Sequence, residues 1–493
     1  MAGRRHMGGP GAVEKAKDFK GTIKKLIKYI ASYKVALVFV TIFAIGSTIF
    51  NIVGPKVLSK ATTEIFNGLV AKVQGTGGID FDKIGTVLLI LLGLYLLSAF
   101  FSFVQGWIMT GISQKMSYRM RKELSEKINR MPMKYFESNT NGEVLSRITN
   151  DVDTLGMSLN QSITTLITSI TTIIGVLIMM LSINWIMTLI ALVILPISMA
   201  LIMLVVKKSQ KYFKSQQEYL GHVNGQVEEV YGGHLVVKAF GREEQCIEEF
   251  SKDNKVLYRS ALMSQFLSGM MQPIMTFVGN LGYVAVAVVG AWLAIKKAIT
   301  VGDIQAFIQY VRQFTQPVTQ IAQVSNMLQS TAAAAERVFE FLEEEEEDQT
   351  VPNPVHVDKV EGRVTFEDVH FGYNPDKIII NDFSADVKPG QTVAIVGPTG
   401  AGKTTMVKLL MRFYDVNSGS VKVDGHDIRD FNRSDLREMF GMVLQDTWLF
   451  NGTIMENIRY GKLDATDEEV IEACKAAHVD RFIRTLPGGY NME

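Results

Sequence analysis

Long apolar stretches with few or no charged residues dominate the first two thirds of the chain. Five of them recur, and one is long enough for two helices separated by a turn at residues 182–184. About 20 consecutive apolar residues cross the hydrocarbon of a bilayer as a helix, and several long helices that are apolar on every side are not expected of a protein surrounded by water. The pattern therefore predicts six membrane helices, within residues 35–53, 84–114, 154–206 (two helices), 260–295 and 304–335, the last being the least hydrophobic.

Lysine and arginine concentrate in alternate connections between these helices. The N-terminal segment is basic, as are the connections after the second and fourth helices, whereas the turn between the third and fourth helices has no basic residue. The two remaining connections carry only a few lysines, among them Lys60, Lys72, Lys83, Lys296 and Lys297. Since basic loops stay on the cytoplasmic side of a membrane, both termini and the two long basic connections are predicted to be cytoplasmic.

Each long basic connection has a helical pattern that is interrupted, at residues 138–142 in the first and at residues 231–234 in the second. Helices that run past the membrane, break and return would present short crosswise elements to a cytoplasmic partner. Residues 141–151 and 227–240 are the candidates for these elements, and two surface loops are the alternative.

The N-terminal segment has two parts. Residues 1–13 are rich in glycine and are predicted to form a disordered tail. In residues 14–30, lysines alternate with apolar residues at helical spacing, namely Phe19, Ile23, Leu26, Ile27 and Ile30. A basic amphipathic helix of this kind suits the surface of an anionic membrane leaflet, and a helix packed on a protein domain is the alternative.

Six glutamines lie at helical spacing along the last membrane stretch and share one face: Gln305, Gln309, Gln313, Gln316, Gln320 and Gln323. Because glutamine is costly against lipid, the stripe is predicted either to line a substrate pathway or to bond to another helix. Arg312 lies one position off the stripe and would cost roughly 2.5–3.5 kcal/mol at mid-membrane unless solvated or paired. Three clustered methionines are predicted to form either an adaptable apolar surface or part of the core: Met270, Met271 and Met275.

The pattern changes to α/β after an acidic run at residues 343–348. The linker is placed at residues 343–359, between a transmembrane domain at residues 14–342 and the beginning of a nucleotide-binding domain at residues 360–493. Alternating apolar positions predict strands at residues 363–373, 383–387, 420–423 and 441–444. Helical spacing predicts helices at residues 434–440, 453–460 and 467–478.

The clearest chemical motif lies in this second domain. A short apolar run at residues 393–396 is predicted to be a buried strand, and a helical pattern follows the glycine-rich segment after it. The segment fits the phosphate-loop pattern in its proper strand–loop–helix context, with the residues Gly397, Pro398, Thr399, Gly400, Ala401, Gly402, Lys403, Thr404 and Thr405. A glycine-rich turn that binds nothing is the alternative, and the agreement of all three parts argues against it.

Each residue type in this loop suits a nucleotide phosphate. Glycines permit close backbone approach, and the backbone N–H groups and the positive end of the following helix form an anion cradle. Lys403 supplies a charge for the β- and γ-phosphates, and Thr404 a hydroxyl for Mg²⁺. Thr405 adds a phosphate contact. ATP and Mg²⁺ are therefore the predicted ligands.

Overall charge and cysteine content argue against a nucleic-acid-binding protein, a disulfide-stabilised protein and a cysteine-based metal site. The chain of 493 residues has 50 basic and 50 acidic side chains, which gives no indication of a nucleic-acid partner. Cys246 and Cys474 are far apart in sequence and make neither a disulfide framework nor a metal site.

Taken together, these motifs resemble an ABC exporter half-transporter, which has six membrane helices followed by a nucleotide-binding domain on one polypeptide. Residues 371–373 (FGY) match the position of the family's adenine-stacking aromatic, so the resemblance implies that role for Tyr373. Residues 443–446 (VLQD) resemble the Q-loop, which implies that Gln445 senses Mg²⁺ and the γ-phosphate and acts with Lys403 in catalysis. Residues 136–153 and 237–244 resemble the two coupling loops of bacterial multidrug exporters.

One departure from the family concerns the end of the sequence at Glu493. The signature motif, the Walker B aspartate with the catalytic glutamate, and the switch histidine are expected further on, and His478 is in the wrong context for that switch. The sequence is therefore predicted to be a partial chain whose phosphate-loop strand lacks its neighbour. ATP binding is predicted from the residues themselves, and hydrolysis only from the resemblance.

The resemblance implies ATP-driven export of apolar or amphipathic compounds, multidrug or lipid-like, across the bacterial cytoplasmic membrane by alternating access. It implies a second half-transporter chain as partner, identical or related, besides membrane lipid and the small-molecule substrate. Two alternatives remain open: a nucleotide-binding but catalytically inert half of a heterodimer, and an ATP-gated regulatory membrane protein.

Overall fold

A computed structural model describes residues 16–374, 377–444 and 447–493, and within them the side chains of residues 194–195, 198–199, 322 and 326 are not described. The predicted tail at residues 1–13 and Gln445 lie outside the described residues. The chain divides into two compact units, Met1–Glu347 and Asp348–Glu493. The boundary between them falls within the expected linker.

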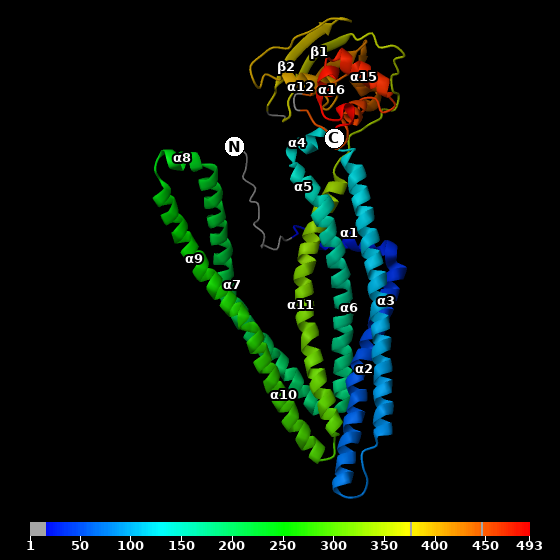
Figure 1. Cartoon of the computed structure of the whole chain (residues 1–493), viewed down its shortest axis with the longest axis vertical. Coiled ribbons are helices and arrows are strands. Elements are labelled where there is room, and N and C mark those ends of the chain that lie inside the picture. Colours follow the sequence, from blue (N-terminus) through cyan, green and yellow to red (C-terminus); the bar gives the residue numbers. More distant parts are fainter. Residues whose placement is uncertain (1–15, 375–376, 445–446) are drawn as a thin grey trace. The chain divides into compact units, whose positions relative to one another are not determined.

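The first unit is helical throughout its described elements (Figure 1). Its long helices are α2 (Lys34–Val73), α3 (Phe81–Ile128), α6 (Val152–Ile183), α7 (Trp185–Gly232), α9 (Glu243–Gly269), α10 (Met271–Ile295) and α11 (Val301–Glu343). Its short ones are α1 (Phe19–Ile30), α4 (Met133–Ser138), α5 (Asn141–Ser146) and α8 (His234–Ala239), with one 3₁₀ turn (Ala31–Tyr33) and one π-helical turn (Arg147–Asp151).

Four helical segments of the described residues are long and apolar enough to cross a membrane: Phe19–Val73, Phe81–Ile128, Asn141–Ile183 and Glu243–Ile295. The other two predicted membrane helices correspond to α7 and α11, which are 48 and 43 residues long. All of these helices extend beyond the apolar stretches that predicted them, because the ladder of backbone hydrogen bonds continues where the side chains become polar. The long helices followed by a separate unit with a sheet agree with the predicted fold class.

The helices of the first unit form a bundle and an arm. Helices α2, α3, α6 and α11 run side by side in the bundle, while α7, α8 and α9 form an arm that diverges from it (Figure 1). Both interruptions predicted in the basic connections are present. The first lies between α4 and α5, where Thr140 caps α5, and the second lies at Gly233, between α7 and α8.

Helix α1 begins later than the pattern predicted, because the Asp18 carboxylate accepts a hydrogen bond from Gly21 N at 2.9 Å and caps the helix at Phe19. Leu26 and Ile30 are buried in a core that they share with α3 and α11, and Lys25 forms a 2.6 Å ion pair with Glu343. Ile27 remains 62% exposed. The helix therefore packs on the protein with one face and presents another apolar side chain outward.

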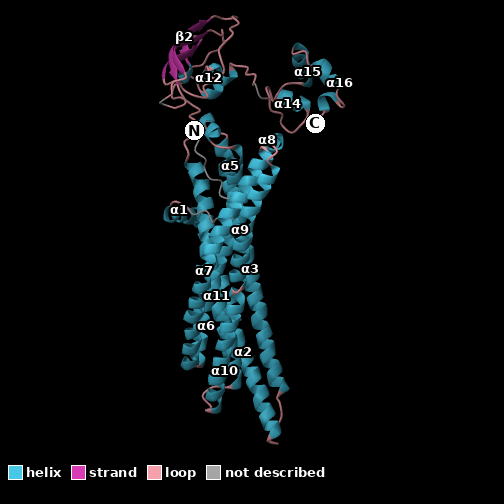
Figure 2. Ribbon diagram, turned by 90° about the vertical axis from the view of Figure 1, so that its left-hand side faces the viewer, coloured by secondary structure: helices cyan, strands magenta, loops and turns pink. Residues whose placement is uncertain are grey.

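The strands of the second unit lie together in one sheet (Figure 2). The sheet has four strands in the order β2-β1-β3-β4, and all neighbouring pairs are antiparallel. Its strands are β1 (Val364–Phe371), β2 (Ile380–Val387), β3 (Ser418–Val423) and β4 (His426–Asp427). Its helices are α12 (Lys403–Leu410), α13 (Arg433–Glu438), α14 (Ile454–Arg459), α15 (Asp467–Ala476) and α16 (Asp480–Thr485), besides two 3₁₀ turns (Ile428–Asp430 and Gly489–Asn491). The core of this unit joins Phe366, Val369 and Val421 of the sheet to Met406 and Leu409 of α12.

Two predicted strands are wrong. Residues 393–396, before the phosphate loop, and residues 441–444 have no strand structure, and Val396 and Val443 are 86% and 95% exposed. A buried strand needs neighbours that satisfy its backbone N–H and C=O groups. No described strand pairs with either segment, and an apolar run alone does not supply such a partner.

Candidate functional site

The phosphate loop reaches its helix through two glycines with left-handed backbones. Gly400 has φ +86° and Gly402, the N-cap residue of α12, has φ +85°. L-residues with a Cβ adopt these angles only with strain. The glycine pattern in the sequence therefore corresponds to a real backbone requirement, and it orients the first turn of α12 toward the loop.

Lys403 folds back over this loop. Its ammonium group donates hydrogen bonds to the carbonyl oxygens of Gly397 at 2.8 Å and Pro398 at 2.9 Å. The charge is therefore held at the mouth of the loop, where phosphate oxygens would replace the carbonyls as acceptors. The hydroxyl-bearing Thr404 is exposed beside it, as a metal-binding hydroxyl must be.

The fold brings Tyr373 to the same place from the end of β1. Its hydroxyl lies 3.2 Å from that of the buried Thr405, and its ring lies edge-on against Tyr414 with centroids 4.9 Å apart. Lys408 Nζ lies 5.7 Å from the centre of the Tyr373 ring. Two residues 32 positions apart in sequence thus meet at the start of α12. The structure leaves Gln445 without a position because it falls outside the described residues.

The segment after Gln445 is locally organised. Asn457 accepts a hydrogen bond from Phe450 N at 2.7 Å and donates one to Phe450 O at 2.9 Å, and Phe450 stacks on Tyr460 at 4.7 Å. Thr453 caps α14 in a capping box with Glu456. The hydrogen bond from the Thr453 backbone, followed by that from its hydroxyl, lowers the pKa of Glu456 below its ordinary value.

Two buried arginines support the phosphate-loop helix, and the sequence analysis missed them. Arg412, just after α12, donates to the carbonyls of Ile428 at 3.2 Å and Phe431 at 2.9 Å. Arg433 and Arg412 both contact the Asp415 carboxylate, at 3.1 and 3.0 Å. Basic residues beside an apolar helix were the available signal, but only the fold shows that they are buried.

A second missed contact lies in the membrane domain, where the π-helical turn after α5 meets α11. The buried carboxylate of Asp151 accepts hydrogen bonds from Arg337 Nε at 3.0 Å and Nη2 at 2.5 Å. The buried Lys127 of α3 donates to the carbonyl oxygen of Leu342 at 2.9 Å, near the C-terminal end of α11. One candidate coupling element is thereby tied to the helix that precedes the nucleotide-binding unit.

The glutamine stripe of α11 bonds to other helices at some positions and lines cavities at others. Gln305 accepts a hydrogen bond from Thr62 of α2, and Gln320 accepts one from Ser169 of α6 at 3.1 Å. Gln316 instead lines a cavity of about 670 Å³ between α10 and α11, and Gln309 lines a second cavity of about 440 Å³. The larger cavity is mainly apolar and includes Met271 and Met275, two of the clustered methionines.

Comparisons with known proteins agree with this geometry. Residues 37–318 match the family model described as "ABC transporter transmembrane region", and residues 380–492 match the one described as "ABC transporter". A protein of Mycobacterium tuberculosis named as a fatty acid ABC transporter ATP-binding/permease protein is 42% identical over 97% of this chain and 80% of its own length.

Two further relatives have other names. A putative multidrug export ATP-binding/permease protein of Bacillus subtilis is 32% identical over 95% of this chain and 80% of its own length. An ATP-dependent lipid A-core flippase of Syntrophus aciditrophicus is 30% identical over 81% of this chain and 66% of its own length.

Proposed function

Since the chain belongs to the ABC transporter family, with a transmembrane region and an ATP-binding domain on one polypeptide, we propose that it exports apolar or amphipathic compounds across the cell membrane at the expense of ATP. The observation that carries this proposal is the phosphate loop, with Lys403 bent over its carbonyls, in the same chain as membrane helices that enclose a mainly apolar cavity. An ATP-driven pump for lipophilic compounds requires a phosphate-binding loop and an apolar cavity in one polypeptide.

The nucleotide is held by the residues that the loop brings together. Gly397, Pro398, Thr399, Gly400, Ala401, Gly402, Lys403, Thr404 and Thr405 surround its phosphates, and Tyr373 contacts its base. The hydroxyls of Tyr373 and Thr405 lie 3.2 Å apart, so the two residues would flank the nucleotide between its base and its phosphates. Gln445, which lies outside the described residues, would sense the γ-phosphate as the family resemblance implies.

The site also offers an exposed hydroxyl for the Mg²⁺ that would accompany ATP. Within residues 16–374, 377–444 and 447–493, no group of three or more His, Cys, Asp or Glu side chains could hold a metal ion by itself. Mg²⁺ typically keeps water and phosphate oxygens as ligands, and the exposed hydroxyl of Thr404 fits such a site. The family resemblance implies Gln445, which lies outside the described residues, as a second ligand. The ion would neutralise charge on the phosphates, and Lys403 would orient the γ-phosphate.

The protein acts with a second half-transporter chain, identical or related, and both termini are cytoplasmic. The short helices α5 and α8 transmit nucleotide binding to the membrane helices. α8 is suited to contact a protein surface, because Leu235 and Val236 on it and Phe240 at its end are 83%, 60% and 75% exposed. Relatives named for fatty acids, lipid A-core and multidrug export support an amphipathic or apolar substrate.

The test uses inside-out vesicles that contain the full chain, with ATP added outside. We expect ATP-dependent accumulation of a lipophilic dye and ATP hydrolysis stimulated by the dye. K403A should abolish both, and K359A, which removes an exposed lysine far along the chain from the loop, should leave both unchanged. ATP binding without turnover, or turnover that survives K403A, would overturn the proposal in favour of an inert heterodimer subunit or an ATP-gated regulator.

A further inference from the structure

The two membrane cavities adjoin at a positively charged side chain. The larger is lined by α10 and α11 together with one residue of α7, and the smaller by residues of α2, α10 and the outer half of α11. They share three lining residues, Tyr283, Ile308 and Arg312. Among the described residues, Arg312 is the only charged one that lines either of these two cavities.

Arg312 lies well inside the stretch at residues 304–335 that is predicted to cross the membrane. It is 11 residues from Val301, the first residue of α11, which corresponds to about 17 Å along a helix. That is roughly half of the 30 Å thickness of bilayer hydrocarbon. An arginine at this depth therefore requires a compensating group or solvation.

The membrane helices offer no compensating carboxylate. The stretches 35–53, 84–114, 154–206, 260–295 and 304–335 contain no aspartate or glutamate. The nearest acidic residue in sequence, Asp303, is already paired with Lys56 Nζ at 2.6 Å and bonded to Thr300 at the start of α11. Arg312 lines both cavities, so the group that balances its positive charge can come from a ligand.

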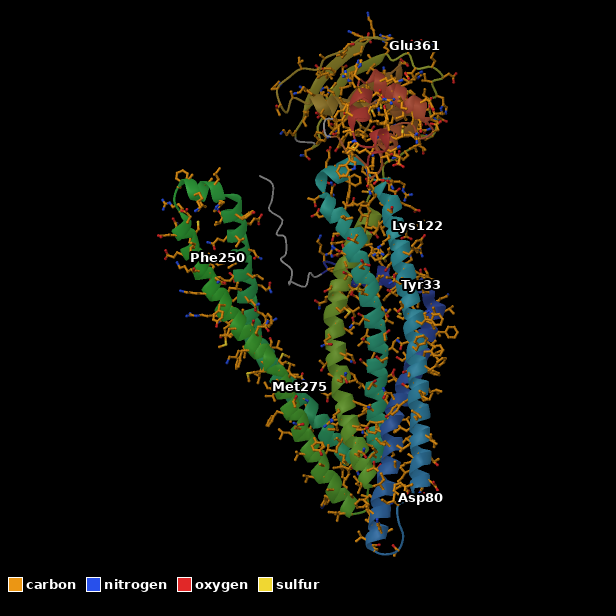
Figure 3. All side chains as sticks on the ribbon, in the orientation of Figure 1. Tyr33, Asp80, Lys122, Phe250, Met275 and Glu361 are labelled. Carbon is orange, nitrogen blue, oxygen red and sulfur yellow. The ribbon has the colours of Figure 1, made fainter. Side chains whose placement is uncertain are left out.

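The rest of the larger cavity suits the other end of such a ligand. Met271, Met275 and Val286 of α10 face Ile308 and Val311 of α11, and methionine adapts to apolar chains of different shape. Met275 is labelled on α10 in Figure 3. Gly279 also lines this space, and a Cβ built on it would meet no atom within 4 Å. The volume of about 670 Å³ lies within the roughly 300–1,000 Å³ typical of small-molecule sites.

We propose that these cavities bind an amphiphile with a single anionic head group, whose charge pairs with Arg312 while its apolar chain lies along the methionines of α10. The proposal rests on the export function above and narrows its substrate to anionic amphiphiles. Because Arg312 lines both cavities, the head group can stay paired with it as the apolar chain of the ligand moves from the larger cavity to the smaller one. Arg312 is thus a specificity-determining residue rather than a catalytic one.

The test measures equilibrium binding to the full chain in nanodiscs of uncharged lipid, without nucleotide, with empty nanodiscs as background. Radiolabelled palmitate is the probe, and hexadecanol is its uncharged match in chain length. R312Q should weaken palmitate binding at least about tenfold, as expected for the loss of a charge-assisted hydrogen bond. R312K should retain most of the affinity, and hexadecanol binding should be the same in wild type and R312Q.

Further variants separate charge from space. G279L places a side chain in the larger cavity and should weaken both ligands, whereas G93L, at a glycine of α3 that also meets nothing within 4 Å and lines neither cavity, should weaken neither. R259Q removes an exposed arginine of α9 and serves as the charge control. Hexadecyl phosphate distinguishes the head groups: equal binding assigns the site to anions in general, and weaker binding to carboxylates.

Palmitate binding that is unchanged in R312Q, or equal affinity for palmitate and hexadecanol, would overturn the inference. Equal melting temperatures of R312Q and wild type exclude misfolding as the cause of lost binding. The failure of the pump proposal looks different: transport would survive K403A, or no lipophile would be pumped, whatever the effect of R312Q on binding.

Discussion

Gly302 marks a close approach of α11 to α2, and we expect G302A to force these helices apart. A Cβ at this position would lie 1.9 Å from the carbonyl oxygen of Ser59 and 2.5 Å from the hydroxyl oxygen of Thr63. Real Cβ atoms essentially never come within 3.0 Å of another heavy atom, so a separation of about 1.1 Å is needed. The Ser59 oxygen belongs to the backbone, so a change of rotamer does not relieve the contact.

The separation would also disturb the bonds next to the contact. Lys56 Nζ and Asp303 Oδ1 are 2.6 Å apart, and the hydroxyls of Thr63 and Thr300 are 3.2 Å apart. An added 1.1 Å places both pairs beyond ordinary hydrogen-bond length. Overpacking costs about 1–3 kcal/mol. The side chains of Lys56 and Asp303 are only 34% and 14% exposed, so their ion pair contributes about 1 kcal/mol, the upper end for exposed pairs, and we expect G302A to destabilise the membrane domain by about 2–4 kcal/mol.

Thermal unfolding of the purified full chain in one detergent, followed by tryptophan fluorescence at a fixed scan rate, measures this loss. G302A should melt at least about 4 °C below wild type. G279A is the matched control, because it makes the same substitution in a membrane helix where the new Cβ meets nothing within 4 Å. Equal melting of G302A and G279A would refute the proposed contact between α2 and α11.

Two further predictions concern charges outside the membrane. D151N removes the negative charge that faces Arg337, and because that arginine is 35% exposed we expect a loss of about 2–3 kcal/mol rather than the full value for a buried pair. Its melting temperature and its ATPase stimulation by lipophiles should fall while ATP binding persists, and unchanged melting would contradict the role of this pair. The lowered pKa of Glu456 means that its contribution to stability is complete above the ordinary pKa of 4.5 and disappears as the pH falls through the lowered value in the folded protein. E456Q keeps a side chain that can cap Thr453 but cannot ionise, so its melting temperature should fall less than that of wild type below about pH 4.5, and superimposable pH curves would argue against this assignment.

Local pattern was sufficient wherever the physical requirement is itself local. The phosphate loop could be read from its residues because Gly400 and Gly402 need left-handed backbones at fixed positions before a helix. The breaks before α5 and α8 were visible for the same reason, since Thr140 and Gly233 interrupt a helix by their own chemistry. The strand predicted at residues 393–396 failed because a strand is defined by its neighbours, which an apolar run does not specify.

The sequence by itself determined that this protein has long membrane helices, because these depend on the free energy of transferring consecutive apolar residues into lipid. It also determined the nucleotide-binding loop, because that loop depends on the backbone of a single turn. Only the tertiary structure decided that Asp151 meets Arg337 across 186 positions, that Gln305 and Gln320 bond to other helices while Gln316 lines a cavity, and that Arg312 stands where two cavities adjoin. Those arrangements are set by packing between segments far apart in the chain. The direction that a side chain faces along a helix can be predicted from its spacing, but what it faces is known only once the helices are packed.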